Sequence, residues 1–327
     1  MSDSAPLIFI HYGPSAYLRQ TLSAAKQSNP SKRVYFLGDV ENRRFCPSGV
    51  EFAPLADFAQ GQKIQDFRAV FRPIQGSKHK FNKHGGMERW LGFVFERWFI
   101  VENFVRSAGV QRFWTFDSDT MVAGDLAARE SRFTGYVATQ QCRGCCLNGL
   151  INSVSLLADY TAWMIGLFHD RKFLEMQQER LQQHEGLAFN EMDAWQHFRD
   201  ENNIATCSLG KERDGELFDD ALAITDGYEV ATEKVLGRTP VKKLMLDSRG
   251  AVFALRAADR APVRMVSLNL SWLPDFLYRR VLPFCLPSGD FSFDASRCRE
   301  LDVREPLGRA MAMRLRSALS GLRPAKL

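Results

Sequence analysis

The sequence has no continuous run of about 20 apolar residues, the length that a membrane-spanning helix requires, and it therefore predicts no transmembrane segment. Its first residues lack the positive start, apolar middle and small-residue cleavage site of a secretory signal, which predicts a cytoplasmic protein. The 7 cysteines are an odd number without the spacing of a disulfide framework, and this favours reduced thiols. Together these absences argue against an integral membrane protein and against a disulfide-stapled secreted one.

The chain also lacks the basic stripe that lines nucleic-acid grooves, so we expect no nucleic acid partner. Its formal net charge is +5, and segment 304–327 carries six basic residues against Glu305 alone, which leaves the remainder close to neutral. This segment has the pattern of a basic amphipathic helix. Such a helix either lies on an anionic membrane surface, here the inner face, or packs on its own domain.

What is present fits an ordinary globular protein, with 45% hydrophobic and 25% charged residues in 327. Short apolar runs alternate with amphipathic stretches, an order that predicts an α/β fold with a mostly parallel, Rossmann-like sheet flanked by helices. We expect strands at 7–10, 33–37, 50–55, 112–116 and 136–139, and helices at 15–28, 87–107, 153–168, 171–184 and 190–202. Residues 75–86 and 140–152 are predicted loops, and short strands are expected within 224–270.

Two aspartates follow the apolar strand predicted at 112–116, and they are the strongest chemical signal in the chain. Asp117 and Asp119 stand two positions apart, at the carboxyl end of the strand, where open α/β sheets bind ligands. A turn between them would let both carboxylates face one hard cation, and Mg²⁺ and Mn²⁺ prefer oxygen ligands shared with substrate phosphates. The alternative interpretation is a surface turn.

Four segments together carry a resemblance to GT-A glycosyltransferases of the bacterial polysaccharide and lipopolysaccharide type. They are Phe113-Trp114-Thr115-Phe116-Asp117-Ser118-Asp119, Phe9-Ile10-His11-Tyr12-Gly13-Pro14-Ser15, Tyr35-Phe36-Leu37-Gly38-Asp39 and Phe95-Glu96-Arg97-Trp98-Phe99. The first resembles the metal-binding strand and Asp-x-Asp motif, the next two the first nucleotide-contacting strands, and the last the helix before the metal strand. The similarity covers most of residues 7–205 and is looser beyond.

The resemblance implies a transfer of sugar from a UDP- or GDP-sugar to a saccharide or lipid-linked acceptor, assisted by Mn²⁺ or Mg²⁺. It implies a nucleotide-sugar-binding half at 1–139, an acceptor-binding and site-completing region at 140–303, and the basic helix at 304–327. The nucleotide-sugar contacts would come from His11, Tyr12, Gly13, Asp39, Arg97, Asp117, Ser118 and Asn148.

The metal would be held by Asp117 and Asp119 with a further ligand from a late strand end. Many relatives place His there; the matching residue here is Asn269, and no histidine follows His197. The alternative interpretations are a plain turn at Asp39 and a charge on the helix surface for Arg97.

An inverting reaction also needs a carboxylate base near the acceptor hydroxyl. Asp193 is the first candidate and Glu191 the second, both at the start of a predicted helix. The competing explanation is that acidic residues in a first turn are favoured by the helix dipole. A retaining enzyme would need no such base.

Other functions remain open at this point. Cys142, Cys145 and Cys146 invite a zinc interpretation, but no second Cys/His pair is near in sequence, which favours ordinary thiols. A haloacid-dehalogenase-type phosphatase also uses two aspartates at this spacing; its motif wants Thr or Val where this chain has Met121. A protein that binds nucleotide-sugars with impaired catalysis is the third alternative, because Asn269 stands where a histidine is usual.

Overall fold

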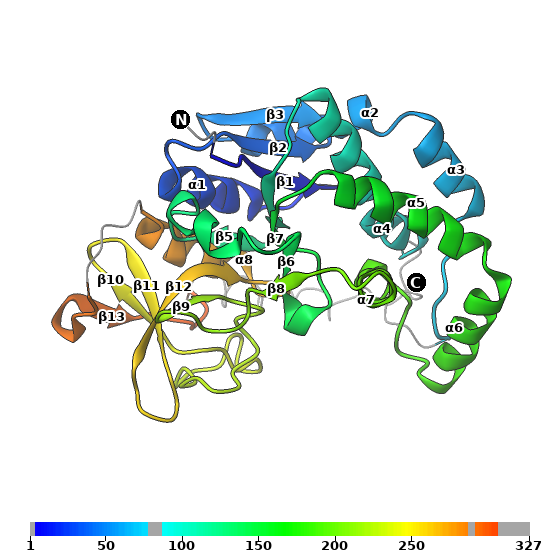
Figure 1. The fold of residues 1–327 in the computed structure, drawn as a ribbon. Helices are drawn as coiled ribbons and strands as arrows, with labels where there is room; N and C mark the ends of the chain where they lie inside the picture. Colours follow the sequence, from blue (N-terminus) through cyan, green and yellow to red (C-terminus); the bar gives the residue numbers. More distant parts are fainter. Residues whose placement is uncertain (1–3, 78–86, 287–291, 307–327) are drawn as a thin grey trace, which may run out of the picture.

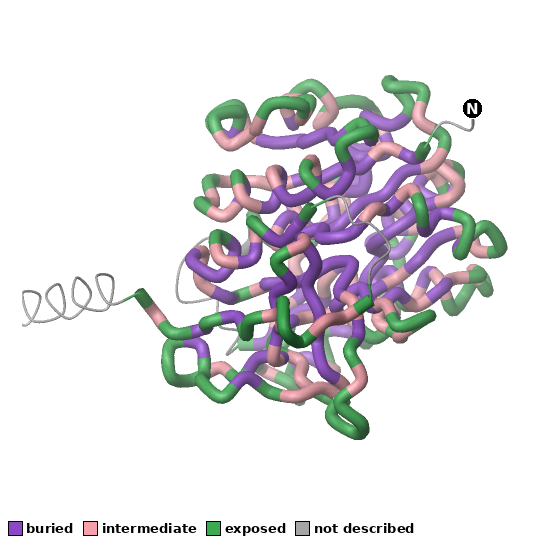
Figure 2. Tube along the Cα trace, turned by 90° about the vertical axis from the view of Figure 1, so that its left-hand side faces the viewer, coloured by how far each residue is buried: buried purple, intermediate pink, exposed green. Residues whose placement is uncertain are grey.

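The computed structural model describes residues 4–77, 87–286 and 292–306, and it contains two β-sheets placed side by side (Figure 1). The predicted loop at 78–86, with His79 and His84, and the predicted basic helix beyond residue 306 lie outside the described residues. Figure 2 shows buried segments of the chain, in purple, running through the interior and exposed segments, in green, at the rim.

The first sheet has seven strands in the order β3-β2-β1-β4-β7-β6-β8. Strands β3, β2, β1 and β4 pair in parallel, as does β6 with β8, whereas β7 runs antiparallel to both of its neighbours. The bounds are β1 Leu7–His11, β2 Val34–Gly38, β3 Val50–Pro54, β4 Phe113–Asp117, β6 Ala138–Gln140, β7 Gly149–Ile151 and β8 Thr206–Ser208. The mostly parallel sheet confirms the predicted α/β class.

Alternation along β1 and β2 divides their side chains between two cores, because successive strand residues point to opposite faces. Ile8, Ile10, Tyr35 and Leu37 pack under one group of helices, and Leu7, Phe9, Val34 and Phe36 pack against α1. The first group comprises α2 Leu55–Phe58, α3 Gln62–Val70, α4 Met87–Ser107, α5 Ser155–His169, α6 Arg171–Gln183 and α7 Glu191–Glu201. Helix α1 spans Leu18–Ser28 on the other face (Figure 1). Helices thus flank both faces of the sheet.

The second sheet has the order β13-β10-β11-β12-β5, with β9 also paired to β12. Its strands are β5 Thr120–Val122, β9 Glu216–Phe218, β10 Leu244–Asp247, β11 Ala251–Leu255, β12 Pro262–Asn269 and β13 Cys298–Glu300, and α8 Asp275–Val281 follows β12. Because β5 begins three residues after β4 ends, the turn at Ser118-Asp119 passes directly from one sheet to the other. The two predicted aspartates therefore lie where the sheets meet.

Most expected elements are present, with shifted ends. Helix α4 has the predicted bounds, whereas α1 begins at Leu18 instead of residue 15. The prediction of a plain loop over 140–152 was wrong, because this segment contains β7 and the short 3₁₀ turn Cys142–Gly144. Further 3₁₀ turns span Val40–Phe45, Ala127–Phe133, Leu282–Phe284 and Ala295–Arg297.

Candidate functional site

The carboxyl ends of β1 and β4 adjoin each other, which brings the first predicted nucleotide segment to the aspartates. The two strands pair in parallel with Ile10 opposite Asp117. Beyond that pair, His11 Nδ1 and Ser118 Oγ lie 2.7 Å apart, and Tyr17 OH lies 3.5 Å from the same hydroxyl. The hydrogen bond fixes the turn after β4 against the end of β1.

His11 is held in its neutral form. Burial lowers its pKa to about 4, although Asp39 and the Gly13 backbone act in the opposite direction. Its Nε2 atom is buried without a hydrogen-bond partner among the described residues. A buried polar atom of this kind is normally satisfied, so Nε2 marks a place where a ligand group or water belongs.

Arg97 of α4 bridges two carboxylates below this turn. Its Nη1 lies 2.6 Å from Asp117 Oδ1 and its Nη2 lies 2.9 Å from Glu191 Oε1. Burial alone would lower the pKa of Arg97, but the two carboxylates outweigh it and raise the pKa above the usual range. The alternative of a helix-surface charge was wrong, because the Arg97 side chain is only 12% exposed.

Glu191 is the deepest carboxylate of this cluster. Burial raises its pKa to about 7, although Arg97 lowers it, and Asp117 adds to the rise. The Tyr160 hydroxyl donates to its backbone carbonyl at 3.0 Å, which anchors the start of α7 to α5. The Arg97 guanidinium thus pairs with two poorly hydrated carboxylates, and these ion pairs join α4, β4 and α7.

Asp119 faces the second sheet and is incompletely satisfied. Ser271 Oγ donates to its Oδ2 at 2.8 Å, whereas its Oδ1 is buried without a partner in the described part of the chain. Burial, with Asp117 nearby, raises the pKa of Asp119 to about 6. A carboxylate oxygen that is buried and unpaired is costly unless a cation or donor meets it.

Asn269, the predicted late ligand, does reach this place. It is the last residue of β12 and pairs with Thr120 of β5, one residue after Asp119. Its Oδ1 accepts the Ser271 amide at 2.9 Å and lies 2.5 Å from Ser271 Oγ, whose single hydrogen it shares with Asp119 Oδ2. The side-chain oxygens of Asp119, Asn269 and Ser271 therefore form one contiguous group.

These oxygens fit a hard divalent cation, because such ions take carboxylate, amide and hydroxyl oxygens and the unpaired Asp119 Oδ1 supplies an open position. In residues 4–77, 87–286 and 292–306, no group of three or more His, Cys, Asp or Glu side chains is placed to hold a metal. A cation bound here would therefore need further oxygen ligands, which Asn269, Ser271, water or a substrate could supply.

Asn148 and Cys146 line the other side of Asp117. Asn148 Nδ2 donates to Asp117 Oδ2 at 3.3 Å, and the Cys146 thiol lies 3.9 Å from the same oxygen. Hydrogen bonding to Cys142 and burial raise the pKa of Cys146 well above its usual range, so its thiol is neutral. The predicted sugar-contacting residue Asn148 thus lies in direct contact with the Asp-x-Asp motif.

Asp39 and Tyr12 lie on the other flank, at the ends of β2 and β1. Asp39 Oδ2 accepts the Gly13 amide at 2.7 Å, and Gly13 adopts a φ of 80°, which favours glycine at this position. Asp39 and Tyr12 also line a cavity of about 550 Å³. This volume lies in the range of ~300–1,000 Å³ that small-molecule sites occupy.

The far wall of this cavity comes from α3 and α4. Phe93 packs on Tyr12 at 5.3 Å between ring centroids, and the Arg89 guanidinium lies over the Tyr12 ring at 4.4 Å. Arg68 and Glu96 form a bidentate ion pair across it, with distances of 2.6 and 2.9 Å. The cavity therefore combines an aromatic wall with charged groups at its edge.

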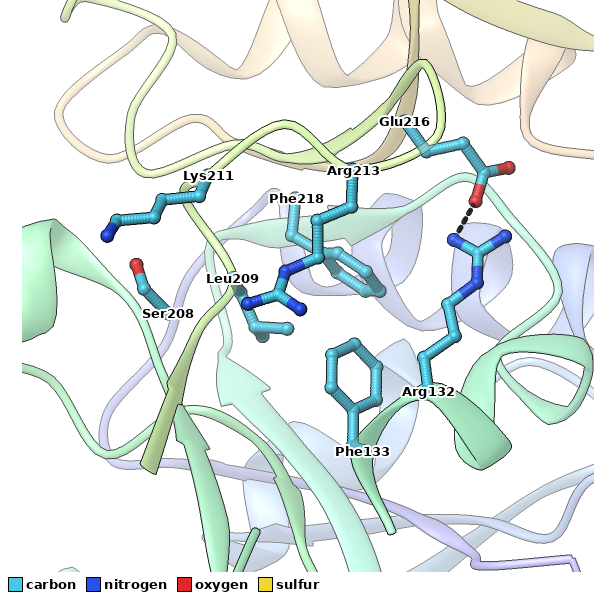
Figure 3. A pocket seen from close by; sticks show the side chains of 8 residues that line it. All are labelled: Arg132, Phe133, Ser208, Leu209, Lys211, Arg213, Glu216 and Phe218. Carbon is cyan, nitrogen blue, oxygen red and sulfur yellow. Dashed lines mark hydrogen bonds and ion pairs between the residues drawn. The ribbon is translucent and has the colours of Figure 1, made fainter. Parts of the chain in front are cut away.

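A second pocket, drawn in Figure 3, is unrelated to this site. Phe133, Phe218 and the cations Arg132 and Arg213 are among its lining residues, and its volume is about 10 Å³. That is room for a single water molecule. It cannot hold a nucleotide.

Asp193, the first candidate base, lies in a helix cap. Its Oδ2 accepts the Asn190 amide at 3.2 Å, while Asn190 Oδ1 accepts the amides of Met192 and Asp193. Arg180 lies 3.6 Å from the same Asp193 oxygen. This capping box accounts for an acidic residue at this position, and of the two candidate bases it is Glu191 that reaches Asp117 through Arg97.

Sequence reasoning missed Ser271, Tyr17 and Tyr278. Tyr278 OH shares its single hydrogen between the backbone carbonyls of Asp119 and Leu270, and its ring stacks on Tyr17 at 4.9 Å. Ser271 and Tyr278 lie 152 and 159 residues from Asp119 in the sequence, so no local signal connects them to it. Only the antiparallel pairing of β12 with β5 brings Ser271 to Asp119, 152 residues away.

Comparison with known proteins gives structural likeness only. No family model matches the chain, and no curated protein sequence matches it. Among solved structures, mouse xyloside xylosyltransferase 1 in its apo form is similar at 10% identity and a TM-score of 0.41, over 65% of this chain and 87% of that chain.

Two other solved structures have similar values. The PaToxG glycosyltransferase matches at 10% identity and a TM-score of 0.34, over 60% and 68% of the two chains, and the bifunctional glycosyltransferase WbbM at 12% and 0.28, over 64% and 39%. At these TM-scores the likeness carries no functional argument. The described helices include none with the length and apolar character needed to cross a membrane.

Proposed function

We propose that this chain is a metal-assisted glycosyltransferase that takes its sugar from a nucleoside diphosphate sugar. The observation that carries the proposal is the buried Oδ1 of Asp119, which has no hydrogen-bond partner within the described residues and lies at the carboxyl end of a parallel strand. The cavity lined by Tyr12 and Asp39 lies on one side of that strand. Ligands of open α/β sheets bind at such strand ends. A nucleoside fits the cavity, and a diphosphate would extend from it towards Asp119.

The residues that would hold the cation are Asp119 and Asn269, with Asp117 beside them. Asp117 keeps its Oδ1 on Arg97 and offers only Oδ2, which has a long contact to Asn148 at 3.3 Å. When bound, Mn²⁺ or Mg²⁺ would neutralise the diphosphate and stabilise it as a leaving group.

The protein groups position the donor around that centre. Asp39 and Tyr12 would bind the nucleoside, the aromatic ring by stacking on the base and the carboxylate by accepting a base or ribose hydrogen. Arg89, whose guanidinium lies over the Tyr12 ring and which lines the same cavity, is placed to meet phosphate charge. In this arrangement Arg97 holds Asp117 and Glu191 in place instead of binding the diphosphate.

The first test is metal-dependent nucleotide binding by the full chain. We expect UDP or GDP with Mn²⁺ to raise Tm, since a ligand that binds only the folded state stabilises it, and Asp119→Asn to abolish the increase. Asp214→Asn is the matched control, because Asp214 is exposed and its φ of 51° suits asparagine. If Asp119→Asn leaves the metal-dependent shift unchanged, the proposal fails.

Donor turnover separates the remaining alternatives. Release of UDP or GDP from a nucleotide-sugar supports a transferase. Metal-dependent binding without turnover on any acceptor tried would instead identify an impaired nucleotide-sugar-binding protein. Hydrolysis of a simple phosphate monoester, lost in Asp117→Asn, would identify a phosphatase and overturn the assignment.

A further inference from the structure

Lys242 and Asp219 form an ion pair in the interior, and neither side chain has a part in the function proposed above. Lys242 Nζ donates to Asp219 Oδ1 at 2.6 Å, and the two side chains are 4% and 0% exposed. The other carboxylate oxygen, Asp219 Oδ2, is buried without a hydrogen-bond partner among the described residues. Asp219 directly follows β9, and Lys242 lies two residues before β10.

The gain in folding stability from such a pair is small. Removing both charges from water costs about as much as their attraction returns, so apolar residues of similar volume often serve a buried position equally well. The unpartnered Asp219 Oδ2 adds a further cost. A buried ion pair can instead be retained because it fixes one arrangement of the segments around it.

Lys242 fixes the loop 219–222 through three hydrogen bonds. Besides the bond to Asp219, its Nζ donates to the Ala221 carbonyl at 2.8 Å. Its backbone amide donates to the Leu222 carbonyl at 3.0 Å. One residue from outside the loop thus holds its first, third and fourth positions.

This loop holds the backbone of Asn269. The Leu222 amide donates to the Asn269 carbonyl at 2.8 Å. Asn269 Oδ1 lies 2.5 Å from Ser271 Oγ, whose hydrogen it shares with Asp119 Oδ2. The loop therefore fixes the backbone of one candidate cation ligand and, through Ser271, adjoins another.

The same loop also holds the turn on the other side of the aspartate motif. The Asp220 carboxylate accepts the backbone amides of Cys142 and Arg143 at 2.8 and 2.9 Å. Cys146, three residues beyond Arg143, has its thiol 3.9 Å from Asp117 Oδ2. The loop is thus hydrogen-bonded to the segments that adjoin both aspartates.

We propose that the Lys242–Asp219 ion pair is the positioning element of the cation site, an assignment that rests on the glycosyltransferase function proposed above. The pair contacts no candidate ligand through its own charges. It fixes loop 219–222, and that loop fixes Asn269 on one flank and the turn that leads to Cys146 on the other. Groups behind a metal site that orient its ligands in this way commonly change metal affinity by about 10–100-fold when they are substituted.

The test is the double variant Lys242→Met/Asp219→Asn of the full chain, which replaces the pair by neutral side chains of similar size. The probe is Mn²⁺, titrated with saturating UDP or GDP and followed by the EPR signal of the free ion. We expect the Mn²⁺ affinity to fall by about tenfold or more. The Tm in EDTA should stay within a few degrees of the wild type, because neutral groups can replace a buried pair. Affinity for UDP or GDP in EDTA should change less than about twofold, because other elements line the nucleoside cavity.

Lys32→Met/Glu130→Gln is the matched control. Lys32 and Glu130 also form a buried ion pair, with side chains 0% and 11% exposed. Glu130 accepts the Ala5 amide and the Trp114 indole N–H, so this pair lies near the amino ends of β1 and β4, whereas Asp117 ends β4. Its removal should change the Mn²⁺ affinity less than about twofold.

Four results would overturn the assignment to Lys242 and Asp219. The first is an unchanged Mn²⁺ affinity in the double variant, and the second is an equal fall in the control. The third is a Tm in EDTA lower by more than a few degrees, which would make the pair structural. The fourth is an equal loss of nucleotide affinity in EDTA, which would show a general disturbance of the site. A wild type that binds no Mn²⁺ with UDP or GDP would refute the glycosyltransferase function, and this assignment with it.

Discussion

The guanidinium of Arg97 lies 2.6 Å from the Asp117 carboxylate, and the contact joins the long helix α4 to the end of the central strand β4. The second nitrogen of the same guanidinium holds Glu191 at the start of α7. Asp117 is thus held by Arg97, whereas Asp119, two residues on, keeps one carboxylate oxygen without a hydrogen-bond partner among the residues that the structure describes. We infer that Asp117 is held in place by its ion pair with Arg97, whereas Asp119 has a carboxylate oxygen available to a ligand.

Arg97→Met should destabilise the protein by about 3–5 kcal/mol, because it leaves two poorly hydrated carboxylates without their counter-ion. Arg97→Lys should lose an intermediate amount of stability, because one ammonium group cannot reach both carboxylates as the planar guanidinium does. Urea unfolding measures the difference. Arg68→Met is the control: its pair with Glu96 is more exposed, and we expect a loss below about 1 kcal/mol. Equal losses at the two positions would contradict a special role for the Arg97 bridge.

Asp119→Asn should stabilise the protein by about 1 kcal/mol in the presence of EDTA, because it removes a charge whose buried Oδ1 has no partner in the described part of the chain. The substituted side chain can still accept from Ser271 through its amide oxygen. The same variant should lose metal-dependent nucleotide binding, so stability and function would move in opposite directions. Thermal unfolding in EDTA measures the stability, and thermal unfolding with Mn²⁺ in the presence and absence of UDP or GDP measures the nucleotide binding. A large loss of stability in EDTA would show instead that Asp119 is purely structural.

His11 should make the free energy of unfolding depend on pH below pH 6.5. Its pKa is about 4 in the folded protein against an ordinary 6.5, because burial disfavours the charged ring. Between these values the unfolded chain binds more protons, so stability from this group is present above pH 6.5 and is lost as the pH falls towards 4. The loss is at most about 3 kcal/mol. His11→Gln should flatten the profile of unfolding free energy from pH 6.5 to 4; an unchanged slope would show that His11 is not buried in neutral form.

The sequence was sufficient for the elements that depend on local pattern. Helix α4 has the bounds predicted from its periodicity, and β4 differs by one residue at each end. Asp117 and Asp119 could be singled out because they follow an apolar strand, and parallel strands bring their carboxyl ends to one edge. The neighbouring end of β1, with His11, follows from the same rule.

The partners of these aspartates could not be predicted. Arg97 and Glu191 were named singly, but they lie 94 residues apart, and only the packing of α4 and α7 on the same helix, α5, brings them together. Ser271 depends on the register of β12 with β5, which pairs Asn269 with Thr120. A shift of one residue in that register would turn the other face of β12 to the site, and no local residue pattern encodes it.

Asp193→Asn should distinguish a helix-capping role of Asp193 from a role as catalytic base. The asparagine oxygen can still accept the Asn190 amide, so we expect a loss of stability below about 1 kcal/mol, whereas Asp193→Ala removes that bond and should lose about 1 kcal/mol. If Asp193 is the base of an inverting transfer, both variants should lose transfer and keep nucleotide affinity. Retained transfer in Asp193→Asn would remove it as base and leave Glu191, to be tested by Glu191→Gln in the same assay.

Gly149→Ala should disturb the site through the backbone that carries Asn148. Gly149 adopts a φ of 95°, and a Cβ there would collide with Thr139 Oγ1 and Leu209 Cδ1, both in the interior. Thr139 Oγ1 also accepts the Leu150 amide and donates to the Asn148 carbonyl, so the collision falls on the bonds that hold this segment. We expect a loss of about 2 kcal/mol or more in urea unfolding, together with weaker nucleotide-sugar binding as Asn148 leaves Asp117. Gly135→Ala is the matched control, because nothing lies within 4 Å of its Cβ position. If Gly149→Ala keeps full stability, the close packing of Gly149 between β6 and β7 is refuted. If it loses stability but keeps full nucleotide-sugar affinity, Asn148 has no part in binding.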